Sequence, residues 1–222
     1  GLLVHRKNYG WGSDENLDEA DIVLAHLRLS ILDLSQRGHQ PMTSSDGRYR
    51  IVYNGEVYNY RELRKELELE GIFFKTDTDT EVVLQALSHW GLDVITRFVG
   101  MFAIALHDDV EKKIYLIRDF FGIKPLFYIK NESGMFGFAS ELPAILALPN
   151  VKRKVNPQRL YDYLLFGDYD SVSETMIEGI KHILPGHYMV VDTATANIIE
   201  ETCYWQPELE PIQQLEWFRF GI

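Results

Sequence analysis

The sequence predicts an α+β domain, and three observations lead to this prediction. Apolar runs typical of β-strands cluster in the middle of the chain and do not alternate strictly with helices. Two pairs of these runs flank short polar turns, residues 100–107 with 113–118 and residues 126–129 with 136–139, as expected of hairpins. Helical periodicity appears in two consecutive segments, residues 59–71 and the segment that follows the 76–80 cluster and ends at Gly91.

The first strand predicted along the chain is a buried one, because residues 21–34 are apolar and β-branched with isolated polar positions. Residues 50–56 predict another strand, ended by a turn at Asn54-Gly55, since this pair readily takes positive φ. Asn59 has the place of a helix N-cap, and Glu62 three residues later suggests a capping box.

The second helix follows a Thr/Asp cluster at residues 76–80, which places Asp79 at or next to its N-terminus. Residues 141–148 predict a short helix. Asn156 followed by Pro157 predicts the start of a helix that reaches about Phe166. A last pair of strands is expected at residues 187–192 and 198–204.

Composition excludes several classes of protein. The 222 residues are 46% hydrophobic and 25% charged, the ordinary mixture of a folded globular chain of one large domain or two small ones. With 22 Lys and Arg against 33 Asp and Glu, the net charge is −11, which disfavours binding to nucleic acid. No apolar stretch approaches the ~20 residues of a membrane span, and no secretion signal is visible. We therefore expect a cytoplasmic protein with no membrane role.

Common motifs for phosphate, metal and hydrolase sites are absent from the sequence. It contains no Gly-x-Gly-x-x-Gly, no Gly-x-x-x-x-Gly-Lys, no His-Glu-x-x-His and no Gly-x-Ser-x-Gly. Its one cysteine, Cys203, can form neither an internal disulfide nor a thiolate zinc cluster. The sequence thus predicts no cofactor and no metal in this domain.

Polar residues at strand ends and at a helix start suggest a site where side chains converge on a cleft. Arg28 lies in an apolar run, where a guanidinium needs a carboxylate from the protein or from a ligand. Together with Glu56 and Asp79, it supplies the charges that complement a zwitterionic amino acid. The Asn54 amide and the Gly55 N–H would form a two-donor site for an oxyanion in acyl transfer.

Each of these residues also has a structural interpretation. Arg28 could form an internal ion pair, Asn54-Gly55 a simple turn, Glu56 a surface acid and Asp79 a helix cap. The pair Arg118-Asp119 ends another apolar run and is a further polar segment of the candidate cleft.

Cys203 and His26 are weaker candidates. No basic residue lies near Cys203 in the sequence to lower its pKa, so we expect an ordinary buried thiol there. His26 would share a strand face with Arg28, although a core histidine is the simpler expectation.

Eight stretches agree in order and spacing with a known protein family over nearly the whole chain. They are residues 26–34, 39–42, 53–59, 78–81, 100–103, 118–128, 138–141 and 184–187. The sequence resembles the glutamine amidotransferase (class II) domain of asparagine synthetase-like proteins, a domain of the N-terminal nucleophile hydrolase type. This resemblance implies a four-layer αββα sandwich with the active site at one end of the stacked sheets.

The resemblance also implies roles for the candidate residues. Arg28 is expected to hold the α-carboxylate of glutamine, and Glu56 and Asp79 its α-amino group. Asn54 and the Gly55 N–H are expected to form the oxyanion hole. The implied reaction is hydrolysis of glutamine to glutamate and ammonia for amide transfer.

The family's nucleophile is a cysteine at the mature N-terminus, followed by a strand and a helix that lead to a His-Arg pair. This chain starts near that pair, His5-Arg6, and Gly1 offers no side chain, so residues 1–222 alone are expected to be inactive. The alternative is a catalytically inactive protein that binds glutamine or acts as a scaffold.

Domain boundaries and partners follow from the same resemblance. Residues 1–206 are expected to be the amidotransferase domain, and residues 207–222 a linker or tail toward an ATP-dependent synthetase domain or subunit. Glutamine is the expected ligand. A homodimer is the default oligomeric expectation.

Overall fold

The structure is a computed structural model that describes residues 2–6, 10–13, 20–27, 38–131 and 134–208. Its centre is a six-stranded antiparallel sheet in the order β12-β11-β7-β6-β5-β4. The strands are β4 Met42–Thr43, β5 Tyr49–Val57, β6 Gly100–Asp108, β7 Lys113–Arg118, β11 His187–Asp192 and β12 Asn197–Cys203.

Two smaller sheets accompany the central one. The first has the order β2-β1-β3, with β1 Leu2–Arg6, β2 Gly10–Gly12 and β3 Ile22–Ala25. The second has the order β10-β8-β9, with β8 Phe127–Lys130, β9 Phe136–Ala139 and β10 Ile180–His182. Both predicted hairpins are therefore present, as β6–β7 and β8–β9.

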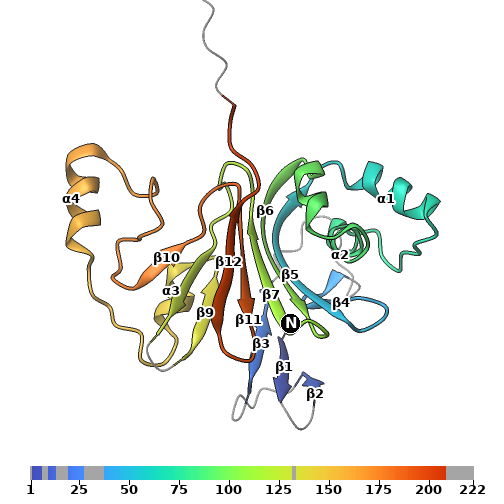
Figure 1. The fold of residues 1–222 in the computed structure, drawn as a ribbon, viewed down its shortest axis with the longest axis horizontal. Coiled ribbons are helices and arrows are strands. Elements are labelled where there is room, and N and C mark those ends of the chain that lie inside the picture. The colour runs from blue at the N-terminus through green and yellow to red at the C-terminus, as the bar shows by residue number, and fades with distance from the viewer. Residues whose placement is uncertain (1, 7–9, 14–19, 28–37, 132–133, 209–222) are drawn as a thin grey trace, which may run out of the picture.

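Helices cover the two outer faces of the stacked sheets (Figure 1). Helices α1 (Tyr60–Leu69) and α2 (Asp79–Trp90), with the 3₁₀ segment η2 (Leu92–Arg97), lie against one face of the central sheet. Helix α3 (Leu142–Leu146) packs on β8 and β9 on the other side. Helix α4 (Pro157–Phe166) stands apart from the stacked sheets.

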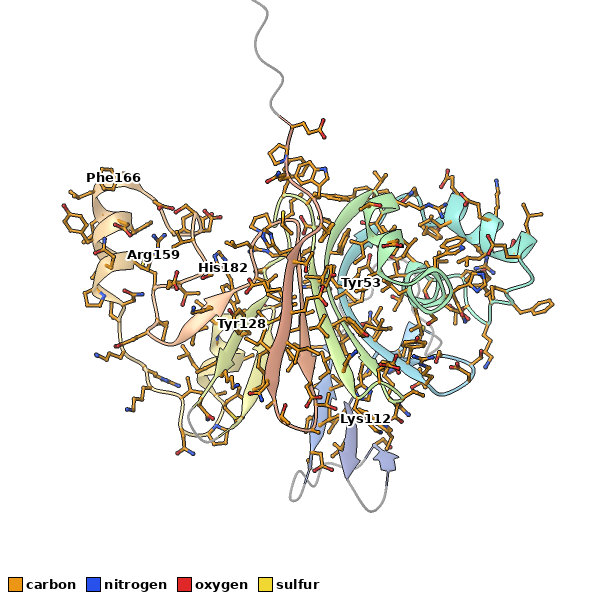
Figure 2. All side chains as sticks on the ribbon, viewed as in Figure 1. Tyr53, Lys112, Tyr128, Arg159, Phe166 and His182 are labelled. Atoms are coloured by element: carbon orange, nitrogen blue, oxygen red, sulfur yellow. The ribbon has the colours of Figure 1, made fainter. Side chains whose placement is uncertain are left out.

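Three apolar clusters hold these layers together. The first joins α1, α2 and η2 to one face of the central sheet through residues such as Ile51 and Leu87. The second fills the space between the sheets, with Val52 from β5 and Tyr128 from β8 (Figure 2 shows Tyr53 and Tyr128 in different layers). The third, around Ile145, attaches α3. The order helix, sheet, sheet, helix is the four-layer αββα sandwich that the resemblance implied.

Local sequence explains how the helices begin. Thr78 caps α2 by accepting a hydrogen bond from the Glu81 N–H, and Asn156 caps α4 in the same way from the Arg159 N–H. The capping box expected at α1 is wrong: Asn59 makes no cap hydrogen bond. Its side chain instead donates to the Arg97 carbonyl and accepts from the Val99 N–H, which joins α1 to the start of β6.

A buried strand was expected over residues 21–34, and the structure describes this segment only as far as residue 27. Within this part, the strand is shorter than expected. Strand β3 ends at Ala25, and the Leu27 side chain is 99% exposed. Arg28 and the rest of this segment lie outside the described residues.

The turn predicted at Asn54-Gly55 is also wrong, because β5 runs without interruption to Val57. Glycine is needed at position 55 for a different reason than positive φ. A Cβ there would lie 2.1 Å from the Met101 carbonyl oxygen and 2.7 Å from the Phe102 Cα. The backbones of β5 and β6 approach too closely for any side chain to fit at this point.

We expect Gly55→Ala to destabilise the protein by about 3 kcal/mol, because the clash is with backbone that cannot rotate away. Gly137→Ala is the matched control. Its Cβ would lie 2.5 Å from Leu148 Cδ1, the end of a flexible side chain, so its cost should stay below about 1.5 kcal/mol. Urea unfolding of both variants measures the difference; equal costs would contradict the close-approach explanation.

Candidate active site at the end of strand β5

Strand alternation sets the directions of the candidate side chains on β5. Tyr53 and Val57 pack in the cluster with the helices, and Val52 packs between the sheets. Because successive side chains point to opposite faces, Asn54 and Glu56 share the face of Val52. Both are half-buried, and neither side chain has a hydrogen bond or ion pair with a described residue. Their polar atoms are therefore available to a ligand.

Among the described residues, no strand pairs with the outer edge of β5 beyond the two residues of β4, and we call this part of β5 its open edge. The Tyr53 N–H donates to Gln40 Oε1 at 2.6 Å, and the Val57 N–H donates to Asp79 Oδ2 at 3.3 Å. N–H groups two residues apart point to the same edge of a strand, so the Gly55 N–H lies between these two. It has no hydrogen-bond acceptor among the described residues.

Asp79 is the first residue of α2, where the helix dipole favours a negative charge. Its Oδ2 accepts hydrogen bonds from the Tyr53 hydroxyl at 2.9 Å and from the Val57 N–H. Burial raises the pKa of Asp79, and these hydrogen bonds partly oppose the rise. Burial, with the nearby Asp79 charge, also raises the pKa of Tyr53 far above its usual value, so its hydroxyl remains a donor.

Four of the five predicted site residues thus meet at the end of β5: Asn54, Gly55, Glu56 and Asp79. Asp79 reaches this point from the helix layer, whereas the side chains of Asn54 and Glu56 lie on the opposite face of the sheet. The two layers meet at the open edge. Arg28, the fifth residue, lies outside the described residues.

Arg118 and Asp119 have a structural role in the loop that follows β7. The Arg118 guanidinium donates to the carbonyls of Lys124, Ile183 and Gly122 at 2.6–3.0 Å. The Asp119 carboxylate accepts from four backbone N–H groups, those of Phe102, Phe121, Ile123 and Lys124. The Phe102 contact attaches this loop to β6, and the Ile183 contact attaches it to the segment between β10 and β11.

Three further residues hold the backbone and side chains of the candidate site in place. Reasoning from the sequence did not assign them to the site. They are Gln40, which binds the open edge; Tyr53, which binds Asp79; and Glu81, which holds the turn before α2. All three lie in the stretches that carry the family resemblance, but no spacing rule connects Gln40 with a strand thirteen residues later.

Cys203 is exposed, so the expectation of a buried thiol is wrong. It ends β12, an edge strand, and its Sγ lies 3.2 Å from the Trp205 carbonyl oxygen. The strand order places β12 four spacings from β5, roughly 19 Å at about 4.8 Å per spacing. Cys203 therefore lies too far from the Gly55 N–H to act there. His26 is half-buried.

The described residues contain no group of three or more His, Cys, Asp or Glu side chains placed to hold a metal ion. Within the same ranges, no helix has the length and apolar character needed to cross a bilayer.

Comparison with known proteins decides the family. A family described as glutamine amidotransferase domain matches residues 4–205. This chain belongs to that family. It is 37% identical over 194 residues to asparagine synthetase [glutamine-hydrolyzing] 3 of Bacillus subtilis, a match that covers 86% of this chain and 31% of the relative. It is 40% identical over 214 residues to putative asparagine synthetase [glutamine-hydrolyzing] 2 of Methanocaldococcus jannaschii, covering 89% and 40%.

Solved structures agree with the fold of this amidotransferase domain. The allosteric regulatory enzyme of purine biosynthesis superposes with a TM-score of 0.62 at 15% identity, over 93% of this chain and 43% of that one. Glutamine phosphoribosylpyrophosphate amidotransferase of B. subtilis gives 0.56 at 16% identity, over 82% and 34%. The chain spans roughly a third of the length of the two synthetase relatives named above.

The raised pKa of Asp79 has a defined effect on stability. The folded state holds this proton to a higher pH than the unfolded chain does, so the free energy of unfolding falls as pH rises from the ordinary carboxyl range through the raised pKa. The Tyr53 hydroxyl limits this loss because it stabilises the ionised form.

We therefore predict that Tyr53→Phe raises the pKa of Asp79 further. The titration midpoint of the ¹³C-labelled Asp79 carboxyl, followed by NMR, measures this. Tyr188→Phe is the control, because the Tyr188 hydroxyl donates to Glu200 on β12 and should not affect Asp79. A Tyr53→Phe midpoint equal to that of the unaltered protein would show that this hydroxyl does not stabilise the carboxylate.

Proposed function

We propose that this amidotransferase domain binds glutamine and hydrolyses it to glutamate and ammonia for amide transfer by an asparagine synthetase-like protein. The observation that carries the proposal is the Gly55 N–H on the open edge of β5, which has no acceptor in the described part of the chain and lies between the hydrogen-bonded N–H groups of Tyr53 and Val57. A fixed donor of this kind, with the Asn54 amide beside it, suits the oxyanion that forms when an amide carbonyl is attacked.

In the proposed complex, Glu56 and Asp79 bind the α-ammonium of glutamine and Arg28 binds its α-carboxylate. Attack by a thiolate on the side-chain amide carbon forms a tetrahedral oxyanion. The carbon–nitrogen bond then breaks, the nitrogen leaves as ammonia after gaining a proton, and water hydrolyses the thioester to glutamate. No cofactor takes part in these steps. The names of the relatives, glutamine-hydrolysing asparagine synthetases, support the choice of substrate.

A second candidate function is glutamine binding without hydrolysis, with the pocket acting as a sensor or scaffold. Cys203, the single cysteine of residues 1–222, lies roughly 19 Å from β5. These residues therefore supply the proposed binding groups without a thiol at the site. The two candidates share the glutamine pocket and differ only in the nucleophile.

Glutamine binding tests what both candidates share. We expect L-glutamine to bind residues 1–222 in a calorimetric titration, and Asp79→Asn to weaken binding at least tenfold, since a charge-assisted hydrogen bond contributes about 1.5–3 kcal/mol. Asp192→Asn is the control, because Asp192 accepts hydrogen bonds only from Thr195 at the β11–β12 turn. Equal affinity of the Asp79→Asn variant would contradict the assigned role.

Intact-mass spectrometry of the native protein distinguishes hydrolysis from binding alone. Exposure to an electrophilic glutamine analogue should add one adduct, located by peptide mapping on an N-terminal cysteine. Such an adduct is expected if the protein is a glutaminase, because only an activated thiolate at the pocket reacts quickly. A protein that binds L-glutamine but forms no adduct would overturn hydrolysis and leave the binding function.

A further inference from the structure

We propose that Glu81 is a positioning residue for glutamine: it fixes the turn of residues 75–78 so that Asp79 is held at the open edge of β5. The inference rests on the proposed function, in which Asp79 binds the α-ammonium of glutamine. Glu81 itself is the third residue of α2, in the first turn of the helix, and is only 6% exposed, so it acts through Asp79.

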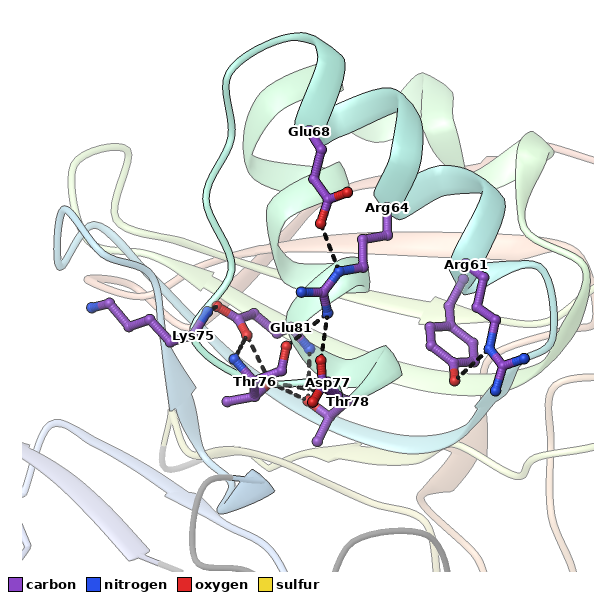
Figure 3. A network of polar contacts seen from close by, with 9 residues as sticks. Arg61, Arg64, Glu68, Lys75, Thr76, Asp77, Thr78 and Glu81 are labelled. Carbon is purple, nitrogen blue, oxygen red and sulfur yellow. Dashed lines mark hydrogen bonds and ion pairs between the residues drawn. The ribbon is translucent and has the colours of Figure 1, made fainter.

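The Glu81 carboxylate binds the backbone of the turn directly (Figure 3). Oε1 accepts from the Lys75 N–H at 2.8 Å, and Oε2 accepts from the Thr76 N–H and from the Thr76 hydroxyl, both at 2.6 Å. Three short hydrogen bonds to a buried carboxylate form a strong, directional attachment. They hold the chain three to four residues before Asp79.

This arrangement reaches further than an ordinary capping box. In a capping box the acidic side chain returns to the N–H of the N-cap residue, which here is Thr78. Glu81 passes Thr78 and binds the two residues at the start of the turn. Thr78 caps the helix by itself, through its hydroxyl and the Glu81 N–H at 3.3 Å. Helix capping alone therefore does not require the Glu81 carboxylate.

Arg64 of α1 holds the same turn from outside. Its Nη1 donates to the Thr76 carbonyl at 2.8 Å and lies 3.4 Å from Asp77 Oδ1, and its Nε donates to Glu68 (Figure 3). The turn itself contributes little to the core, since Lys75 and Asp77 are exposed. The polar contacts of Glu81 and Arg64 thus decide where the turn lies.

The position of this turn matters because Asp79 must satisfy two partners on another element. Its Oδ2 meets both the Tyr53 hydroxyl and the Val57 N–H, and the second contact is already long at 3.3 Å. A small displacement of the first turn of α2 would break these bonds and move the carboxylate away from the Gly55 N–H. Loss of the Glu81 carboxylate is therefore expected to weaken glutamine binding.

A double-mutant cycle tests this role. L-glutamine affinity is measured by calorimetry for the unaltered protein, Glu81→Gln, Asp79→Asn and the double variant. If Glu81 acts through Asp79, Glu81→Gln weakens binding about tenfold when Asp79 is present and less than about twofold when residue 79 is already Asn. Glu200→Gln is the matched control, because Glu200 also accepts two side-chain hydrogen bonds but lies on β12; its affinity should be unchanged.

The outcomes are distinct. Equal weakening by Glu81→Gln in both backgrounds, or none in either, overturns the positioning role while glutamine binding stands. Failure of the unaltered protein to bind L-glutamine overturns the proposed function and this inference together. Should Glu81→Gln not fold, as judged by circular dichroism, Arg64→Gln replaces it. Arg64→Gln loosens the same turn from the surface, and the same non-additivity with Asp79→Asn is expected.

Discussion

The open edge of β5 is the constraint on which the site depends. An edge strand exposes unpaired N–H and C=O groups, and proteins usually shield them. Strand β4 pairs only with Arg50 and Ile51, so the protein shields the rest of this edge with side chains: the Gln40 amide at Tyr53 and the Asp79 carboxylate at Val57. The Gly55 N–H between them is left as a fixed donor. The oxyanion site proposed here would need no rearrangement of the backbone.

The opposite edge of β5 explains why residue 55 must be glycine. Gly55 and Phe102 are a pair without mutual hydrogen bonds, because the Phe102 backbone bonds to Asp119 instead. The two strands approach closely there, and a Cβ would clash with the Met101 carbonyl. The residue whose N–H has no acceptor among the described residues is therefore also one at which β5 and β6 approach closely. The buried Asp119 holds the Phe102 backbone on β6, and Phe102 is the residue paired with Gly55. Asp119 thus supports the candidate site through the neighbouring strand.

Local patterns in the sequence predicted the elements that local interactions determine. The Thr/Asp cluster at residues 76–80 and Gly91 located the two ends of α2, and hence Asp79, because helix ends depend on residues within one turn; within this cluster, Thr78 is the capping residue. The turn at Asn54-Gly55 failed for the converse reason: pairing with β6 over all nine residues of β5 outweighs the turn preference of this dipeptide.

Contacts between segments that are distant in the chain could not be predicted from the sequence. The hydrogen bond from Tyr53 to Asp79 joins residues 26 positions apart, and no periodicity encodes it. Nor could the sequence show that β12 is an edge strand that leaves Cys203 exposed. The resemblance to a family supplied the roles of the site residues, whereas the structure supplied the reason why Gln40, Tyr53 and Glu81 accompany them.

In the proposed function, glutamine binding and nucleophilic attack are physically separable. The donors and acids at the end of β5 are held by backbone pairing, by the N-terminus of α2 and by Glu81, and none of these contacts involves a thiol. A pocket built in this way can keep its geometry whether or not a nucleophile stands beside it. Hydrolysis adds the requirement of a thiolate within bonding distance of the amide carbon, which Cys203 on β12 cannot meet. The same scaffold is therefore consistent with a glutaminase and with a glutamine-binding protein, and the residue beside the Gly55 N–H determines which of the two it becomes.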